Sequence, residues 1–393
     1  MKKLILNTFK QLAAVSAIVI VASSCNKDVP DPVPNTFAKP TGTSIGTIIS
    51  NDPNFSFLKA AVNRAGLMSL LLDSSKSLTL FAPDNAAFIA SGIPVEAAIG
   101  TLRPGLLDTV LRYHLISQKV KAAQIPNTFP NFQYPTFINP APTVSALLRL
   151  TTFPTTRNGA WINNIPIKGT DIEASNGVIH TVAALVNPPA RFLWNRITSD
   201  PDLDYLEAAI IRADSGVAPT SAASLIGALN NIGANLTVFA PTDAAFQTTL
   251  TGAIYLALVG QGMPQPDALA LAQQLASTPD VFQNPALFST LTAQTVKGIV
   301  VYHVLVSRAF TNNFPTTLTS YPTLLNSAVA AHPGVALQAT PGVPFFTAAS
   351  VKGIANATAS NILINPTPDP NGSSDQHFLN GVIHKIDQVL LPQ

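Results

Sequence analysis

The pattern of apolar and polar positions along this chain is duplicated. Residues 78–88 read Leu-Thr-Leu-Phe-Ala-Pro-Asp-Asn-Ala-Ala-Phe, and residues 236–246 read Leu-Thr-Val-Phe-Ala-Pro-Thr-Asp-Ala-Ala-Phe. The short apolar run in each predicts a buried strand, and the proline that follows ends it. Asp84 and Thr242 are good N-cap residues, so a helix is expected to start directly after each strand.

A second repeated segment opens each copy with a predicted amphipathic helix. Residues 49–62 and 197–210 carry apolar side chains at helical spacing. Asp52 and Asp200 each precede a proline, which places a capping side chain before the first helical position. Each of these helices needs an apolar partner surface.

The later landmarks of each copy predict a further helix and then strands. Another apolar helical pattern ends at a Tyr-His pair, and a strand that starts with Asn-Gly-Val-Ile-His closes the copy. These landmarks are Tyr113-His114, Tyr302-His303, residues 176–180 and residues 380–384. Asn-Gly favours a two-residue hairpin turn, because both positions tolerate positive φ. Residues 161–167, with apolar arms around a polar turn, predict one more hairpin. The predicted fold class is therefore α+β.

These landmarks, in this order in both copies, resemble the fasciclin domain, a family of extracellular adhesion modules. The resemblance covers residues 43–189 and 191–393, which we name the first and second repeat. It implies two tandem domains, each a small twisted β-wedge with packed helices, in a secreted or membrane-anchored, non-enzymatic protein.

The resemblance also supplies candidate binding residues. In animal members of the family the Tyr-His pair has been linked to receptor binding, which implies Tyr113, His114, Tyr302 and His303 as binding residues. Each pair sits in an apolar sequence frame, however. That frame favours a partly buried, structural role.

The second repeat is longer than the first in two places. The extra residues lie near 249–280 and 365–376. We expect a helix over residues 267–277, capped by Asp267, and an exposed loop rich in proline, asparagine, glycine and serine over 365–376. Segments that the fold does not need are candidates for function and equally for neutral drift.

Composition narrows the classes of partner. The chain has 393 residues, enough for two domains, but only 11% are charged and the net charge is +2. Nucleic acid is therefore not expected as a partner. The mean hydropathy is +0.30, yet no run of about 18 apolar residues follows the N-terminus, so no transmembrane helix is predicted.

The N-terminus predicts export and lipid anchoring. Residues 1–25 combine a lysine-rich start, an apolar stretch over 12–22 and small residues before Cys25, which is typical of a lipoprotein signal peptide. Cys25 is the only cysteine and is the predicted lipidation site. Residues 26–42 are proline-rich and predict a tether. We expect anchoring to the cell envelope at the outer membrane, and Lys-Asp behind Cys25 resembles surface-export signals.

The histidines show no catalytic or metal-binding spacing. There is no His-Glu-x-x-His, no cysteine pair and no Gly-x-Ser-x-Gly, so no catalytic residue, metal or cofactor is predicted. His180 and His384 alternate with apolar residues, which favours core histidines bonded to backbone.

Three functions remain open. The first is adhesion, or capture of an unknown surface protein or glycan, with the membrane reached through the lipid anchor. The second is an accessory subunit of an outer-membrane uptake complex, bound through the insertions. The third is a hydrolase or isomerase in the longer repeat, using His332 or His377 with a nearby carboxylate.

Overall fold

The computed structural model describes residues 42–340, 342, 348–365 and 372–393. The predicted signal peptide, Cys25 and the tether up to residue 41 lie outside the described residues, as do residues 366–371 of the predicted loop. Gly42–Gln393 is one compact unit. The structure mixes helices and sheets, so the predicted α+β class is confirmed.

Helices dominate the first half of each repeat. The first repeat has α2 (Ile45–Asn51), α3 (Ser56–Arg64), α4 (Met68–Leu72), α5 (Asn85–Ala90) and α6 (Pro104–Tyr113), with 3-10 helices at Pro53–Phe55, Glu96–Thr101 and Ala122–Gln124. The second repeat has α7 (Leu193–Ile197), α8 (Asp204–Ala213), α9 (Leu225–Leu229), α10 (Asp243–Gly260), α11 (Gln265–Leu275) and α12 (Ala293–Tyr302), with 3-10 helices at Pro279–Gln283, Pro285–Leu287, Thr311–Asn313 and Leu324–Ser327.

Strands dominate the second half. The first repeat has β1 (Leu78–Pro83), β2 (Leu115–Ile116), β3 (Tyr134–Pro135), β4 (Thr151–Thr152), β5 (Pro154–Thr155), β6 (Trp161–Ile162), β7 (Ile165–Ala174) and β8 (Gly177–Val182). The second has β9 (Leu236–Pro241), β10 (Val304–Leu305), β11 (Thr319–Tyr321), β12 (Val335–Thr340), β13 (Ala348–Lys352), β14 (Ser360–Asn361), β15 (Gln376–Phe378) and β16 (Gly381–Ile386).

The two repeats build their central sheets in the same way. The first sheet has the strand order β2-β1-β8-β7-β6-β5, and the corresponding sheet of the second repeat has the order β10-β9-β16-β15. In each, the first strand of the repeat runs parallel to the last, with Leu78 opposite Gly177 and Leu236 opposite Gly381. Over the four strands that the two sheets share, the duplication in the sequence is therefore a duplication of strand order and register, and β6 and β5 extend the sheet of the first repeat.

The repeated strand, proline and helix start are confirmed. β1 and β9 are buried along their whole lengths, as apolar central strands should be. Asp84 Oδ1 accepts a hydrogen bond from the Ala87 amide at 2.8 Å, and Thr242 Oγ1 accepts one from Ala245 at 3.3 Å. Both therefore cap the following helix as predicted.

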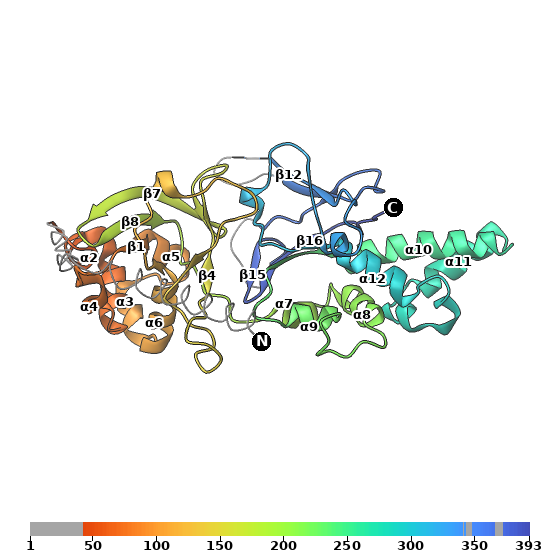
Figure 1. Ribbon diagram of the computed structural model, residues 1–393, viewed down its shortest axis with the longest axis horizontal. Coiled ribbons are helices and arrows are strands. Elements are labelled where there is room, and N and C mark those ends of the chain that lie inside the picture. Colours follow the sequence, from red (N-terminus) through yellow and green to blue (C-terminus); the bar gives the residue numbers. More distant parts are fainter. Residues whose placement is uncertain (1–41, 341, 343–347, 366–371) are drawn as a thin grey trace, which may run out of the picture. The chain divides into compact units, whose positions relative to one another are not determined.

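The helices of the first repeat cover one face of its sheet. Figure 1 shows α2, α3, α4 and α6 on the same side of β1, β7 and β8. Apolar side chains from both layers meet there in a buried core that includes Ile45, Leu58, Leu80, Leu111 and Ile179. The apolar faces of the predicted amphipathic helices are therefore buried against the sheet.

The predicted Asn-Gly turns are wrong in register by one residue. Ala174 pairs with Gly177, so the turn residues are Ser175 and Asn176, and the glycine is already the first residue of β8. The asparagine acts through its side chain instead. Asn176 Oδ1 accepts from the Ile45 amide at 2.8 Å, and its Nδ2 donates to Leu71 O at 2.9 Å. Asn176 thereby ties α2 and α4 to the sheet.

The first insertion of the second repeat is a helix pair. α10 continues from the repeated helix start and packs along α11 (Figure 1). The predicted helix over 267–277 exists, but it runs from Gln265 to Leu275 and its N-cap is Pro264. Asp267 lies in the first turn, so its predicted capping role is wrong. None of the helices in the described part of the chain is long and apolar enough to cross a membrane.

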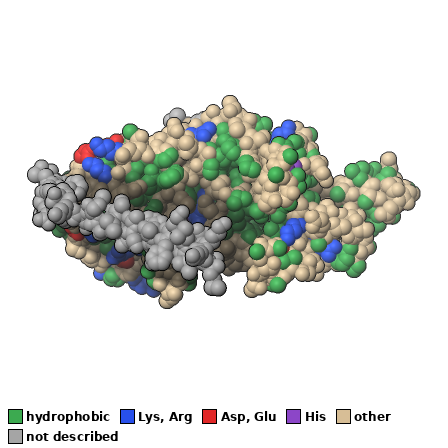
Figure 2. Space-filling model, viewed as in Figure 1, with side chains coloured by type: hydrophobic (Ala, Val, Ile, Leu, Met, Phe, Trp, Pro, Cys, Tyr) green, Lys and Arg blue, Asp and Glu red, His purple; other side chains and the backbone are tan. Residues whose placement is uncertain are grey.

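The described part of the second insertion, residues 365 and 372–376, is less exposed than we predicted. Ser374 and Gln376 are only 2% and 3% exposed, and Gln376 begins β15. The polar side chains here bond to neighbouring backbone, which compensates their burial. Elsewhere, the face of the molecule in Figure 2 carries few charged side chains, as the composition implied.

Candidate functional site

The tyrosines of the two Tyr-His pairs are buried. Tyr113 and Tyr302 end α6 and α12, and both side chains are 0% exposed. Tyr113 Oη donates to Thr151 O at 2.9 Å, and Tyr302 Oη donates to Gly334 O at 2.7 Å. Burial raises the pKa of both phenols, so each stays protonated as a hydrogen-bond donor.

The histidines of the same pairs are buried as well. His114 Nδ1 donates to Val110 O at 2.8 Å, and its Nε2 accepts from the Val186 amide at 3.0 Å. His303 repeats this arrangement, with Ile299 O at 2.8 Å and the amide of Leu390 at 2.8 Å. Burial lowers the pKa of His114 and of His303 to about 4, so both rings are neutral at neutral pH.

These four residues therefore lie where a partner cannot reach them. Tyr113, His114, Tyr302 and His303 each have their polar atoms bonded inside the fold, and none is more than 2% exposed. To bind a partner, these side chains would have to be exposed to solvent, and in this structure they are buried. Each histidine instead fastens a helix end to the last segment of its repeat.

His180 and His384 are core histidines, as predicted. His180 Nε2 donates to Val120 O at 2.8 Å, and His384 Nε2 donates to Ala309 O at 2.9 Å. The other ring nitrogen accepts from the amide of Asp171 at 3.3 Å and of Asp375 at 3.1 Å, respectively. Burial lowers the pKa of both rings.

The two histidines proposed for catalysis have different surroundings. His332 Nε2 donates to Pro392 O at 2.9 Å and its Nδ1 accepts from the Gly334 amide at 3.0 Å. His377 lies on β15, where Arg308 contacts its Nε2 and Tyr113 Oη is 3.4 Å from its Nδ1. The hydrogen-bond partners of both rings are thus other than carboxylates, so neither forms a base with an orienting acid.

His377 belongs to a buried polar network between the repeats. The Arg308 guanidinium is 5% exposed and donates to Asn235 Oδ1 at 2.8 Å and to Phe378 O at 2.9 Å. Its central carbon is 5.1 Å from the ring centroid of Phe153 in the first repeat. Burial lowers the pKa of Arg308 to about 10. Burial, and after it the charge of Arg308, keeps the pKa of His377 well below its ordinary value.

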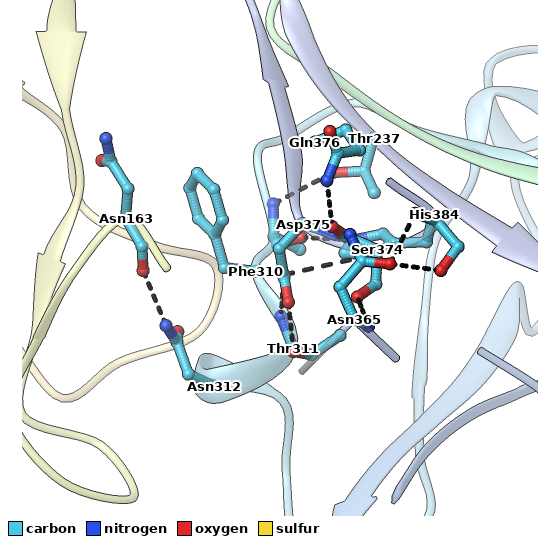
Figure 3. Close-up of polar contacts among 12 residues, drawn as sticks. Asn163, Thr237, Phe310, Thr311, Asn312, Asn365, Ser374, Asp375, Gln376 and His384 are labelled. Atoms are coloured by element: carbon cyan, nitrogen blue, oxygen red, sulfur yellow. Dashed lines mark hydrogen bonds and ion pairs between the residues drawn. The ribbon is translucent and has the colours of Figure 1, made fainter. Parts of the chain in front are cut away.

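Asparagine side chains bond the two repeats directly. Asn312 Nδ2 donates to Asn163 O at 2.6 Å, a contact drawn in Figure 3. Asn158 Nδ2 donates to Asn312 O at 3.1 Å and to Phe314 O at 3.0 Å. Asn313 accepts from Thr155 Oγ1 at 3.0 Å. We call these contacts, with the Arg308 network, the inter-repeat junction.

A cleft of about 450 Å³ opens beside the junction. Both repeats line it, the first through residues 90–91, 161–166 and 183–187, the second through residues 311–312, 364–365 and 374–375. A neighbouring hollow of about 200 Å³ shares Asn164 and Asn187 with it. Concave sites between domains are where small ligands are most often bound.

Sequence reasoning did not find the junction or the cleft. The asparagines that form the junction come from Thr311-Asn-Asn-Phe314 and from the turns around Asn158 and Asn163, which are unremarkable as single motifs. One available signal was that His377 occurs only in the second repeat, where Glu173 stands at the matching position of the first. That difference marks the place where the repeats meet.

The part of the chain that the structure describes contains no cluster of side chains that could bind a metal ion. Within the described ranges, no group of three or more histidine, cysteine, aspartate or glutamate side chains could hold an ion. The fold and its buried polar network define a duplicated α+β protein in which the tyrosine and histidine of each Tyr-His pair bond to its own backbone.

Comparisons with known proteins find a fasciclin domain in the first repeat. Residues 53–188, which lie in the first repeat, match the fasciclin domain model. Protein sll1483 of Synechocystis sp. (strain ATCC 27184 / PCC 6803 / Kazusa) is 28% identical over 155 residues, which are 39% of this chain and 77% of that protein. The transforming growth factor-beta-induced protein ig-h3 of Sus scrofa is 29% identical over 161 residues, 38% of this chain, but only 20% of that protein is covered.

One solved structure to which this chain is similar is a FAS1 domain pair from the insect cell adhesion molecule fasciclin I. It is 16% identical with a TM-score of 0.34, covering 85% of this chain and 95% of that chain. Fasciclin domains are commonly adhesion or binding modules of extracellular or cell-surface proteins, and they are typically non-enzymatic.

Proposed function

We propose that this protein is a non-enzymatic, lipid-anchored adhesin of the cell surface. It would bind a neighbouring cell, the matrix, or a surface protein or glycan through its two fasciclin repeats. Cys25 would carry the lipid and residues 26–42 would hold the repeats away from the outer membrane.

The fasciclin match over residues 53–188 carries this proposal. The buried state of the motif histidines supports it, because five of the six histidines bond to backbone through at least one ring nitrogen. Recognition would then rest on shape and on uncharged hydrogen-bonding groups, since the low charge gives little long-range steering.

The helix pair α10–α11 favours the uptake-complex alternative. Residues 243–275 contain no lysine or arginine, and Leu256 and Leu269 are 69% and 44% exposed. Exposed leucines on a surface that has few charged residues are typical of a protein contact. The insertion would be the docking element in that case.

Deletion and re-expression in the source cells test the proposal. We expect deletion to reduce attachment to neighbouring cells, matrix or an immobilised glycan, and the full-length chain to restore it. Cys25→Ala should release the protein from membrane fractions and leave attachment unrestored, because the repeats are then no longer tied to the surface. Measurements are cell attachment counts and immunoblots of fractionated membranes.

Two outcomes would contradict the adhesin. Unchanged attachment after deletion would remove its support. A stoichiometric transporter partner, co-purified from detergent-solubilised membranes and lost in a Leu256→Ser/Leu269→Ser variant, would favour the accessory subunit instead.

A further inference from the structure

We infer that the cleft between the repeats is a binding site for a neutral carbohydrate. This inference rests on the proposed binding function and names the site and the ligand class. The cleft holds about 450 Å³, within the range of about 300–1,000 Å³ that is usual for small-molecule sites. Such a volume suits a short saccharide.

The lining of the cleft offers little charge for ionic recognition. Asp375 is the one charged residue among those that line the 450 Å³ cleft. Its carboxylate accepts from the Thr311 amide at 2.7 Å and from Thr311 Oγ1 at 2.6 Å, as Figure 3 shows. No lysine or arginine lines the cleft, so an anionic ligand would have no partner for its charge, and the one carboxylate already holds Thr311.

The side-chain amides of the lining suit hydroxyl groups. Asn164 is half-buried and Asn187 is exposed, and neither side-chain amide takes part in a hydrogen bond among the described residues. Each amide offers two donor hydrogens and an acceptor oxygen. Sugar hydroxyls also donate and accept, so one amide can serve two neighbouring hydroxyls of a ring.

The floor of the cleft carries one further unmet acceptor. Asn312 is 2% exposed, and its Nδ2 is engaged with Asn163 O across the junction. Its Oδ1 has no hydrogen-bond partner within the described ranges. A buried acceptor without a donor is costly, and a hydroxyl or a water held by a bound sugar would satisfy it.

Apolar groups complete the wall. Pro166, Ala184 and Leu185 are partly exposed in the cleft, beside the 7%-exposed ring of Trp161. The C–H faces of a sugar ring can pack on such a surface. The cleft is less suited to a peptide that binds as an added strand. β7, which supplies Ile165 and Pro166, is already paired with β6 and β8 and offers no free edge.

The two tryptophans of the chain allow the site to be located as well as detected. The full-length chain is first applied to an array of neutral and acidic oligosaccharides, with maltotriose, cellotriose and triacetylchitotriose as neutral probes and trigalacturonic acid as the acidic one. A Trp194→Phe variant leaves Trp161 as the only tryptophan. We expect a neutral probe to bind by calorimetry and to change the fluorescence of Trp161 in this variant.

Substitution of the two available amides tests the contacts. Asn164→Ala/Asn187→Ala should weaken binding by about tenfold or more, since two or more hydrogen bonds are lost. Asn63→Ala removes an exposed asparagine of α3 outside the cleft and should leave the affinity unchanged. Unchanged unfolding midpoints would show that both variants fold.

The possible results separate this inference from the proposed function. Absence of binding to every neutral probe overturns the carbohydrate site, and so does equal or tighter binding of trigalacturonic acid. The inference is also overturned if the double variant binds the neutral probe with unchanged affinity and the fluorescence of Trp161 does not change on binding. Binding of a peptide in the same cleft would overturn it as well. In each of these cases the protein can still mediate cell attachment. The adhesin proposal is tested separately, by measuring attachment after deletion of the protein.

Discussion

The histidine that follows each repeated tyrosine uses both ring nitrogens inside the fold. Nδ1 donates to the backbone carbonyl four residues earlier, and Nε2 accepts from an amide near the end of the repeat. The same ring thus bonds to a carbonyl at the C-terminal end of a helix and to an amide of a distant segment. Only the neutral ring can do both, because the protonated ring has no acceptor.

Stability should therefore depend on pH through His114 and His303. Burial lowers the pKa of each from an ordinary 6.5 to about 4. Between these values the unfolded chain binds more protons, so the stabilisation is complete above about pH 6.5 and is lost as the pH falls toward 4. A shift of this size corresponds to roughly 3 kcal/mol per histidine.

A His303→Gln variant measures this contribution. We expect it to be less stable than wild type at pH 7.5, with the difference shrinking toward pH 4.5, because glutamine does not titrate. Urea unfolding across this range gives both curves, and carboxylate titration cancels in the difference. Asn63→Ala should give a curve parallel to wild type. A difference that stays constant with pH would refute the structural role of the neutral ring.

At the scale of elements, the parallel pairing of first and last strand organises each repeat. Gly177 and Gly381 stand where β8 and β16 meet β1 and β9. A Cβ added at Gly177 would lie 2.0 Å from Leu78 O, and one at Gly381 would lie 2.5 Å from Leu236 O. The glycine of the motif therefore serves close approach of two strands.

A matched pair of glycine substitutions tests this. Gly177→Ala should lower the free energy of unfolding by more than about 2 kcal/mol, because β1 and β8 must separate to admit the methyl group. Gly105→Ala, in the first turn of α6 with nothing within 4 Å of an added Cβ, should be neutral or stabilising by up to about 1 kcal/mol. Denaturant unfolding followed by circular dichroism compares the two, and equal effects would contradict this reading.

At the scale of the whole molecule, the junction joins the repeats through buried polar groups. Asn158 and Asn313 make four hydrogen bonds across it, two donated by Asn158, one accepted and one donated by Asn313. Phe153 and Phe310 pack beside them with ring centroids 5.9 Å apart. Buried hydrogen bonds of fixed geometry specify one mutual arrangement of the repeats, which the cleft needs if it is to keep its shape.

The described unit should therefore unfold in one cooperative transition. We expect an Asn158→Gly/Asn313→Ala variant to lose roughly 2–6 kcal/mol and to unfold in two steps by calorimetry, as four inter-repeat bonds are removed. Asn158 has a φ of 53°, so glycine adds no backbone strain there. Asn163→Gly, also at a φ of 53°, mainly removes bonds within the first repeat and should lower stability without splitting the transition. Two transitions in wild type would contradict the coupling.

Much of each repeat could be predicted from the sequence, while the site could not. The strand and its caps at Asp84 and Thr242 follow from local propensity, and so they were predicted correctly. The role of Asn176 depends on Ile45 and Leu71, more than 100 residues away in the chain, which no local pattern contains. The same limit explains why Asp267 looked like a cap and Gln376 looked exposed.

The sequence by itself determined the duplication, the α+β class and the resemblance of the first repeat to a fasciclin domain, because these depend on local periodicity and on the order of short motifs. It also determined the low fraction of charged residues. Tertiary structure alone decided that the Tyr-His pairs are buried and that the repeats meet through Asn158, Asn312 and Asn313. It alone placed Asn164 and Asn187 around a cleft, because burial and mutual position arise from packing between segments far apart in the chain.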